Sequence, residues 1–186
     1  MKTAVVLVSG GIDSAVALDW ARKRYRPLAV SYQVAGRPRG EARACAAIVR
    51  RAGVEHLPVA VPFLRPRASG YAPARNLVFH SIALAIAEDR KAKAVIAGHN
   101  ASDAAAFADA RPSYLRRVEG LGNGIRILLP LARLTDAQVI ARGLRQGVPL
   151  ELTWSCYRDG ARPCRRCSAC RGRLESFQHS GLEDPS

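Results

Sequence analysis

The sequence predicts an α/β fold built on a doubly wound parallel sheet. Short aliphatic runs alternate with amphipathic stretches along most of the 186 residues, which is the pattern of successive β–α units. The first aliphatic run ends in a Gly-Gly turn that leads directly into a helical pattern. Late in the chain, Thr135 and Gln138 have the spacing of a capping box, which marks the start of another helix.

The expected strands and helices follow one another in turn. We expect strands at residues 5–8, 28–32, 56–61, 94–97 and 125–129, because each is a short, mainly aliphatic run. Amphipathic spacing predicts helices at residues 13–24, 41–52, 76–89 and 135–146. A loop rich in Pro and Arg is expected at residues 62–75, and a polar loop with a short helix at residues 99–121. Residues 1–186 are expected to form one domain, with ligands at the carboxyl ends of its strands.

Composition limits the classes of function. The formal net charge is +14, and most of the positive charge is Arg, spread along the chain. This charge would suit a nucleic-acid partner, but solvated faces and anionic small substrates explain it as well. No apolar run reaches the roughly 20 residues that a membrane span needs, so we expect a cytoplasmic protein.

The turn after the first aliphatic run predicts a site for a polyanion. It reads Ser9-Gly10-Gly11-Ile12-Asp13-Ser14. Glycines allow the backbone to approach oxygen atoms closely, and the first N–H groups of the following helix point to the same place. The alternative is an ordinary turn between a strand and a helix. The turn is too short for the nucleotide-triphosphate loop that ends in Gly-Lys-Ser/Thr, and it lacks the lysine.

This motif resembles the PP-loop ATP pyrophosphatases, whose signature is Ser-Gly-Gly-x-Asp-Ser after the first strand. The resemblance implies a Rossmann-like sheet of the PP-loop or HUP type. It also implies a loop that grips the pyrophosphate part of ATP, in an enzyme that transfers AMP to an oxygen atom of its substrate.

Four of the five cysteines are spaced as Cys156-x7-Cys164-x2-Cys167-x2-Cys170. Short Cys-x2-Cys loops let two sulfur atoms reach one metal ion, so we expect residues 153–175 to form a loop that holds structural zinc. An iron–sulfur cluster, disulfides and free thiols are the alternatives. The fifth cysteine, Cys45, lies in a helical pattern and is expected to be a small buried residue.

With the cysteines at one end and the glycine turn at the other, the chain resembles the 7-cyano-7-deazaguanine synthase family. The segments between them are similar too: Arg75-Asn76 with Phe79, Ala97-Gly98, Ser102-Asp103, Phe107-x-Asp109-x-Arg111, Leu129-Pro130-Leu131, and Thr153-Trp154-Ser155-Cys156-Tyr157.

The family resemblance implies a reaction of queuosine or archaeosine biosynthesis. ATP would activate the carboxylate of 7-carboxy-7-deazaguanine, and ammonia and a second activation would give 7-cyano-7-deazaguanine. The implied ATP-binding residues are Ser9, Gly10, Gly11, Ile12, Asp13, Ser14, Arg75, Asn76 and Gly98, with Asp13 a candidate contact for Mg²⁺. The implied catalytic residues are Asp13, Ser14, Arg75 and Asp103, and the implied substrate-binding residues are Phe107, Asp109 and Arg111.

These polar residues also have ordinary structural interpretations. Arg75 and Asn76 could simply begin a helix, Asp103 and Asp109 could be solvated loop carboxylates, and Arg111 could be a surface charge.

Three segments depart from the family pattern. Residues 32–41 keep Arg37 and Glu41 but lack the family's Asp, Tyr, Gln and His. Asp136 stands where the family has Lys, and residues 107–111 lack its Tyr, Pro and Cys. These departures leave three other outcomes open: an amide as the final product, transfer of the acyl group to an amine on a protein, or a PP-loop enzyme that modifies tRNA. A basic zinc module on nucleic acid is the non-enzymatic alternative, and a homodimer is compatible with the sequence.

Overall fold

The computed structural model describes residues 1–66 and 72–185, and its centre is a five-stranded parallel sheet. The sheet has the order β3-β2-β1-β4-β5, and every pairing is parallel. The strands are β1 (Thr3–Leu7), β2 (Arg26–Val34), β3 (Glu55–Val61), β4 (Ala94–Ile96) and β5 (Arg126–Leu128). This arrangement confirms the predicted fold class.

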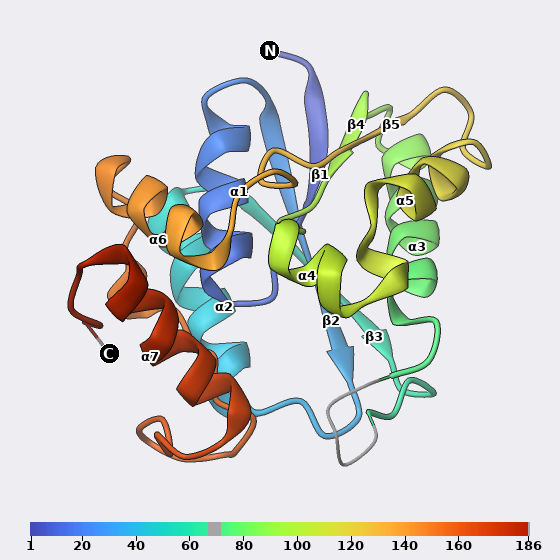
Figure 1. Ribbon diagram of the computed structural model, residues 1–186. Coiled ribbons are helices and arrows are strands. Elements are labelled where there is room, and N and C mark those ends of the chain that lie inside the picture. The colour runs from blue at the N-terminus through green and yellow to red at the C-terminus, as the bar shows by residue number, and fades with distance from the viewer. Residues whose placement is uncertain (67–71, 186) are drawn as a thin grey trace.

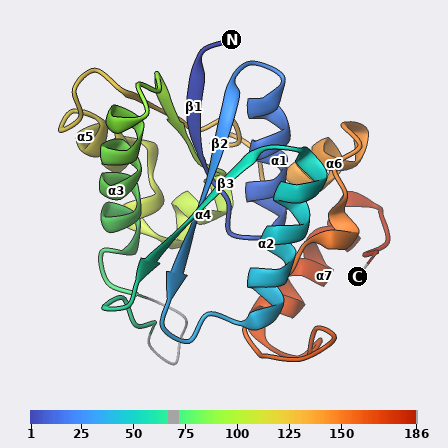
Figure 2. The ribbon, with the colours of Figure 1, turned by 180° about the vertical axis from the view of Figure 1, so that it is seen from behind.

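Helices cover both faces of the sheet (Figures 1 and 2). Because side chains alternate along a strand, Ala4 and Val6 of β1 face one layer and Val5 faces the other. The first layer contains α1 (Ile12–Arg22), α2 (Arg39–Ala52), α6 (Asp136–Arg145) and α7 (Ser168–Ser180). The second contains α3 (Arg75–Asp89) and α5 (Pro112–Glu119).

The strand order reverses between β1 and β4. The chain runs outward from β1 to β3, returns through α3 to β4 on the other side of β1, and continues to β5. Consequently α1, which follows β1, and α3, which precedes β4, lie on opposite faces of the sheet. A crevice opens between them at the carboxyl ends of β1 and β4. The short helix α4 (Ala101–Ala106) lies beside this edge (Figure 1).

The expected elements are present, with shifted limits. β1 begins and ends before the expected 5–8, and β2 extends beyond 28–32 at both ends. The capping box of α6 is confirmed, because Thr135 Oγ1 accepts from Gln138 N and Gln138 Oε1 accepts from Thr135 N. Residues 67–71 of the expected loop 62–75 lie outside the described residues.

Two regions contain more regular structure than the sequence predicted. The stretch 99–121 holds α4, a 3₁₀ turn at Ala108–Ala110 and α5. The zinc loop was expected over residues 153–175, but its second part belongs to α7, which begins at Ser168. The irregular part of the loop lies between a second 3₁₀ turn at Leu150–Leu152 and α7. None of the described helices is long and apolar enough to cross a membrane.

Candidate active site

The Ser9–Ser14 turn is organised around one hydroxyl group. Ser14 Oγ accepts hydrogen bonds from the backbone N–H groups of Ser9 (3.2 Å) and Gly10 (3.3 Å) and donates to the carbonyl of Gly11 (2.9 Å). The hydroxyl of Ser9 lies 3.2 Å from Ser14 Oγ and also accepts from Gly11 N. Ser14 therefore closes the turn from inside, and its hydroxyl shapes the backbone.

Two glycines are required by close packing. Gly10 has φ +108°, and a Cβ there would lie 2.5 Å from the carbonyl oxygen of Glu41 and 2.8 Å from the nitrogen of Cys45. A Cβ on Gly98 would lie 2.7 Å from the carbonyl group of Asp13. The turn is thus pressed against α2 on one side, and the end of β4 is pressed against the start of α1. Gly11 differs, since the nearest atom to its Cβ position is 3.5 Å away.

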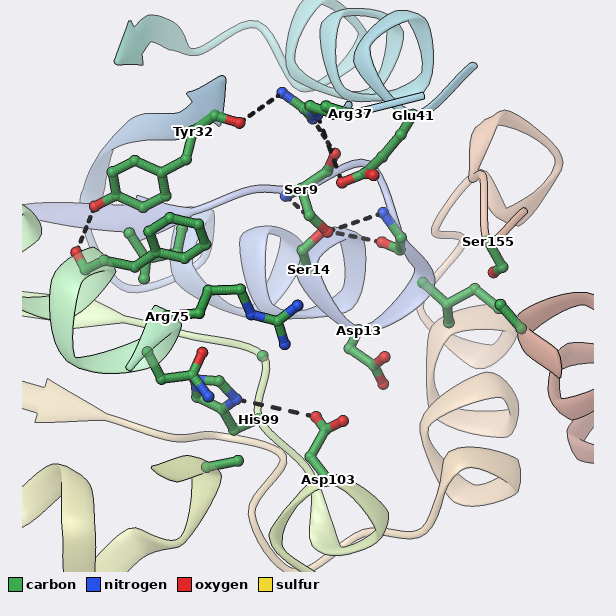
Figure 3. Close-up of a pocket in the computed structure, with 18 of the residues that line it drawn as sticks. Ser9, Asp13, Ser14, Tyr32, Arg37, Glu41, Arg75, His99, Asp103 and Ser155 are labelled. Carbon is green, nitrogen blue, oxygen red and sulfur yellow. Dashed lines mark hydrogen bonds and ion pairs between the residues drawn. The ribbon is translucent and has the colours of Figure 1, made fainter. Parts of the chain in front are cut away.

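A cavity of about 780 Å³ opens beside this turn, at the carboxyl ends of β1 and β4 (Figure 3). That volume is within the range of small-molecule sites. Most of the predicted site residues lie on its wall: Ser9, Gly11, Ile12, Asp13, Ser14, Arg75, Asn76, Gly98, Asp103 and Phe107.

Three predicted site residues lie beside the wall in the described part of the chain. Gly10 is the packed glycine of the turn. Asp109 accepts a hydrogen bond from Asn76 N (3.4 Å) at the first turn of α3. Arg111 is exposed and donates to the carbonyl of Ala104 (3.2 Å). The two charged side chains therefore bind the backbone of segments that line the cavity.

Three carboxylates converge on the cavity near the start of α1. Asn100 is buried, and its Nδ2 donates to Asp13 (2.9 Å) and to Asp136 (2.8 Å). Asn100 also caps α4 in a capping box with Asp103. Removal from water, with Asp103 and Asp136 nearby, raises the pKa of Asp13 to about 7, although the Asn100 hydrogen bond opposes the shift. Burial likewise raises the pKa of Asp103.

This cluster predicts that stability declines with rising pH. Between the ordinary value of 3.8 and about 7, the folded state keeps the Asp13 proton that the unfolded state has lost, so the contribution of Asp13 to stability falls across this window. In Asp13→Asn this loss is absent. We expect the variant to melt a few degrees above the parent protein at pH 8 and no higher than it at pH 5, in scans without divalent cations. The same shift at both pH values would contradict this account of Asp13.

Arg37 ties the end of β2 to the turn. Its guanidinium donates to the carbonyl groups of Ser9 (2.5 Å) and Tyr32 (3.1 Å), and its Nε lies 3.5 Å from Glu41. Burial raises the pKa of Glu41, and the charges of Arg37 and Arg75 oppose that shift. Neither Arg37 nor Glu41 was predicted as a site residue, although both matched the family pattern. Asn100 was missed because an amide after a strand carries no distinctive signal.

The side of the cavity formed by α3 carries aromatic rings. Tyr32 and Phe79 stack with centroids 4.1 Å apart and planes 11° apart. The Tyr32 hydroxyl donates to the carbonyl of Phe79 (2.5 Å), which fixes the pair. Both rings line the cavity, together with Arg75 and Phe107. A flat, partly charged ligand matches this combination.

The four predicted cysteines come together at the start of α7. The sulfur atoms of Cys156, Cys164, Cys167 and Cys170 all lie within 4.8 Å of one another. The Cys156–Cys167 and Cys164–Cys170 pairs are each 4.0 Å apart. Four thiolates in a tetrahedron at about 2.3 Å from zinc would be roughly 3.8 Å apart, so the cluster fits such an ion. The fifth cysteine, Cys45, is buried elsewhere, as predicted.

The cysteine module is joined to the Ser9–Ser14 turn through Trp154. Trp154 N donates to the carbonyl of Gly10 (2.9 Å), and Trp154 Nε1 donates to the carbonyl of Cys156 (2.8 Å). The indole ring packs on Gly40 so closely that a Cβ there would lie 2.3 Å from it. Buried Arg173 of α7 anchors the other end of the module through Thr153 (2.8 Å) and Asp184 (2.8 Å). The module therefore supports one wall of the cavity.

The chain is similar to a known protein family over most of its length. The family described as "Queuosine biosynthesis protein QueC" matches residues 3–68 and 66–181. A protein of Thermosynechococcus vestitus named 7-cyano-7-deazaguanine synthase is 38% identical over 99% of this chain and 94% of its own length. Proteins of the same name from Thermoplasma acidophilum and Acinetobacter baylyi are 35% and 34% identical, over 99% and 98% of this chain and 91% and 93% of their own lengths.

Among solved structures, NMN synthetase from Francisella tularensis is similar in fold, with a TM-score of 0.62 at 15% sequence identity. The match covers 98% of this chain and 78% of the synthetase. On the family match and the full-length relatives, the chain belongs to the QueC family, whose matched relatives are named 7-cyano-7-deazaguanine synthase.

Proposed function

We propose that the protein is an ATP-dependent ligase that converts 7-carboxy-7-deazaguanine and ammonia into 7-cyano-7-deazaguanine. The observation that carries the proposal is the cavity in which the Ser9–Ser14 turn, Arg75 and an aromatic wall meet. Membership of the QueC family and the name shared by its relatives support the same reaction.

The chemistry needs positioning and charge stabilisation more than a protein nucleophile. A carboxylate oxygen attacks the α-phosphorus of ATP, and pyrophosphate leaves. Ammonia then attacks the acyl carbon of the adenylate, AMP leaves with the former carboxylate oxygen, and loss of a proton gives the amide. The amide oxygen attacks a second ATP in the same way, and loss of AMP and protons leaves the nitrile.

At the turn, backbone groups would hold the leaving pyrophosphate. Gly11 lies open to the cavity, and the first N–H groups of α1 carry the positive end of the helix dipole. In this proposal Ser14 acts by keeping the turn closed, and Gly10 and Gly98 act by close packing. Arg75 would neutralise a phosphate or the substrate carboxylate through its planar guanidinium.

The carboxylate cluster would hold the divalent cation. Mg²⁺ prefers carboxylate oxygens together with phosphates and water, and Asp13 lies next to the turn that would bind the phosphates. The cation would neutralise phosphate charge and relieve the repulsion of Asp13 by Asp103 and Asp136, which adds to burial in raising the pKa of Asp13. Asn100 donates to both Asp13 and Asp136 and would hold them together for the cation.

The substrate would occupy the side formed by α3 and α4. Asp103 and Phe107 line this side and would contact the bicyclic ring. Asp109 and Arg111 would act through the backbone of Asn76 and Ala104, which they bind. We assign zinc to the four cysteines as a structural ion, and we place the reaction in the cytoplasm, where thiolates remain reduced.

A mass-spectrometric assay tests the proposal. Purified protein with ATP, Mg²⁺, ammonium and 7-carboxy-7-deazaguanine is expected to release AMP and pyrophosphate and to form the nitrile. Omission of ammonium should stop product formation. Absence of both AMP and a new product mass under these conditions would refute the proposal. An amide as the final product would leave adenylation intact and revise only the second step.

A further inference from the structure

His80 has a hydrogen-bonding nitrogen that the protein leaves without a partner. His80 is 0% exposed, and its Nε2 has no hydrogen-bond partner in the part of the chain that the structure describes. The residue nevertheless borders the cavity, on the side formed by α3. A buried polar atom of this kind is uncommon and calls for an explanation, because such atoms are nearly always hydrogen-bonded.

The other ring nitrogen determines which tautomer is present. Nδ1 lies 2.8 Å from the carbonyl oxygen of Asn76, one helical turn earlier. A carbonyl oxygen can only accept, so Nδ1 carries the proton. Burial lowers the pKa of His80 and keeps the ring neutral. The neutral ring therefore presents a lone pair at Nε2, which is a hydrogen-bond acceptor.

The neighbouring His99 does not satisfy this acceptor. The two rings are stacked with centroids 5.2 Å apart and planes 27° apart. The Nε2 lone pair lies in the plane of the His80 ring, whereas His99 lies over its face. The Nδ1 atom of His99 is 4.0 Å from Asp103, and its side chain is 17% exposed at the cavity. Burial, His80 and Arg75 lower the pKa of His99 to about 3, so this ring is neutral too.

The surroundings indicate what chemistry would reach Nε2. The cavity that His80 borders is also lined by the stacked Tyr32–Phe79 pair, the neutral His99 ring and Arg75, and Asp109 is the charged group that acts on the His80 ring. Arg75 supplies the positive charge that an acidic group needs, while the two imidazoles supply stacking surface and an acceptor. An anion would be repelled by the lone pair, but a flat ring with an N–H group would be bound by it.

We propose that His80 is a specificity-determining residue whose Nε2 accepts a hydrogen bond from a ring N–H of a flat heteroaromatic substrate. This inference rests on the proposed function, because a deazaguanine acid is a substrate of that chemical class. His99 lies over the face of the His80 ring, so the substrate N–H group would approach Nε2 at the ring edge, in the plane of the lone pair. Neither histidine belongs to the motifs that carried the family resemblance. The hydrogen bond from the substrate to His80 would therefore be an adaptation of the substrate-binding side of the cavity in this chain.

Two substitutions separate recognition from packing. His80→Leu keeps an apolar side chain in the buried space and removes the acceptor. His80→Gln places an amide oxygen near the position of Nε2. We expect the KM for the deazaguanine acid to rise at least about 10-fold in His80→Leu and to recover partly in His80→Gln. The KM for ATP should stay within about twofold in both variants. His179→Leu, at an exposed histidine of α7, is the matched control.

Substrate analogues give a second, independent measurement. N-methylated analogues of the acid, each with one ring N–H blocked, are titrated calorimetrically in the presence of a non-hydrolysable ATP analogue. The parent protein should discriminate against one of them, and His80→Leu should bind that analogue and the unmodified acid equally well. If His80→Leu fails to fold, His80→Phe, which also lacks the acceptor and keeps a flat ring, provides the same comparison.

The outcomes distinguish this inference from the proposed function. An unchanged KM for the acid in His80→Leu, or undiminished discrimination between the N–H acid and every N-methyl analogue, would overturn the role of His80 while the ligase reaction stands. If the parent protein does not turn the acid over, the proposed reaction fails, and the titrations still show whether His80 recognises the N–H group. Raised melting temperature in His80→Leu together with unchanged substrate binding would identify His80 as a packing residue.

Discussion

Gly10→Ala is expected to destabilise the protein and to abolish most of its AMP formation. The added Cβ would lie 2.5 Å from the Glu41 carbonyl oxygen and 2.8 Å from the Cys45 nitrogen, at a backbone angle of φ +108° that disfavours any side chain. Backbone strain and overpacking together cost about 3 kcal/mol or more, which corresponds to a fall in melting temperature of roughly 6–12 °C for a chain of this size. Displacement of the turn should lower the rate of AMP release about 100-fold.

Two other glycines control for the separate contributions. Gly11 has a negative φ, and no atom lies closer than 3.5 Å to the position of the Cβ that Gly11→Ala would add. The melting temperature of this variant should therefore stay near that of the parent protein. Gly53→Ala, at the end of α2, has φ +66° with open space around it and tests backbone strain alone. If Gly10→Ala melted no lower than Gly53→Ala, close packing of the turn against α2 would not be what requires glycine at position 10.

Replacement of one of the four clustered cysteines is expected to unfold the cysteine module and weaken nucleotide binding. Cys156 is buried, and its sulfur atom accepts hydrogen bonds from the backbone N–H groups of Arg158 (3.3 Å) and Cys164 (3.4 Å). Cys156→Ser should remove the bound zinc, measured by atomic emission, and lower the melting temperature by about 10 °C or more, because structural zinc supplies much of the folding free energy of such modules. The KM for ATP should rise as well, since Trp154 joins the module to Gly10.

Cys45→Ala is the matched control for the cysteine experiment. Cys45 is equally buried but lies away from the cluster, where its thiol donates to the carbonyl of Val8. This variant should keep its zinc and its KM for ATP. Full zinc content in Cys156→Ser, or an unchanged melting temperature after zinc is lost, would contradict a structural metal site. If the anaerobically purified protein contained iron and bound sulfide, the four cysteines would hold an iron–sulfur cluster and not zinc.

The central part of the fold was predictable because its signals are local. Aliphatic runs such as residues 5–8 predict buried parallel strands, and the Thr135–Gln138 spacing predicts the start of α6. The order β3-β2-β1-β4-β5 needs long-range information that strand patterns do not contain. The sequence did not predict α7, because this helix is mostly polar and only a few of its residues, including Phe177, reach the core.

The candidate site was predictable where backbone geometry requires particular residues. Gly10, Gly98 and the four cysteines have chemistry that few other residues supply, so their spacing was informative. The carboxylate cluster was not, because Asp13 and Asp136 lie far apart in sequence and meet only through the hydrogen bonds that both accept from Asn100. In the sequence Asp136 replaces a family lysine, and in the structure it completes this cluster instead of contributing a positive charge.

The pair His80 and His99 illustrates a further limit. Single histidines in apolar patterns are usually satisfied core residues, and nothing in the sequence distinguishes these two from such residues. Their significance depends on the stacked geometry and on the unpartnered Nε2 atom. Both features arise from the way α3 and the segment after β4 approach each other at the cavity.

Transfer of ¹⁸O from the substrate carboxylate tests the proposed adenylation most directly. 7-Carboxy-7-deazaguanine labelled with ¹⁸O in its carboxylate is incubated with the protein, ATP, Mg²⁺ and ammonium, and the nucleotide products are analysed by mass spectrometry. Adenylation predicts AMP that is heavier by one ¹⁸O atom, together with unlabelled pyrophosphate. Appearance of the label in inorganic phosphate with formation of ADP, or AMP without the label, would contradict it.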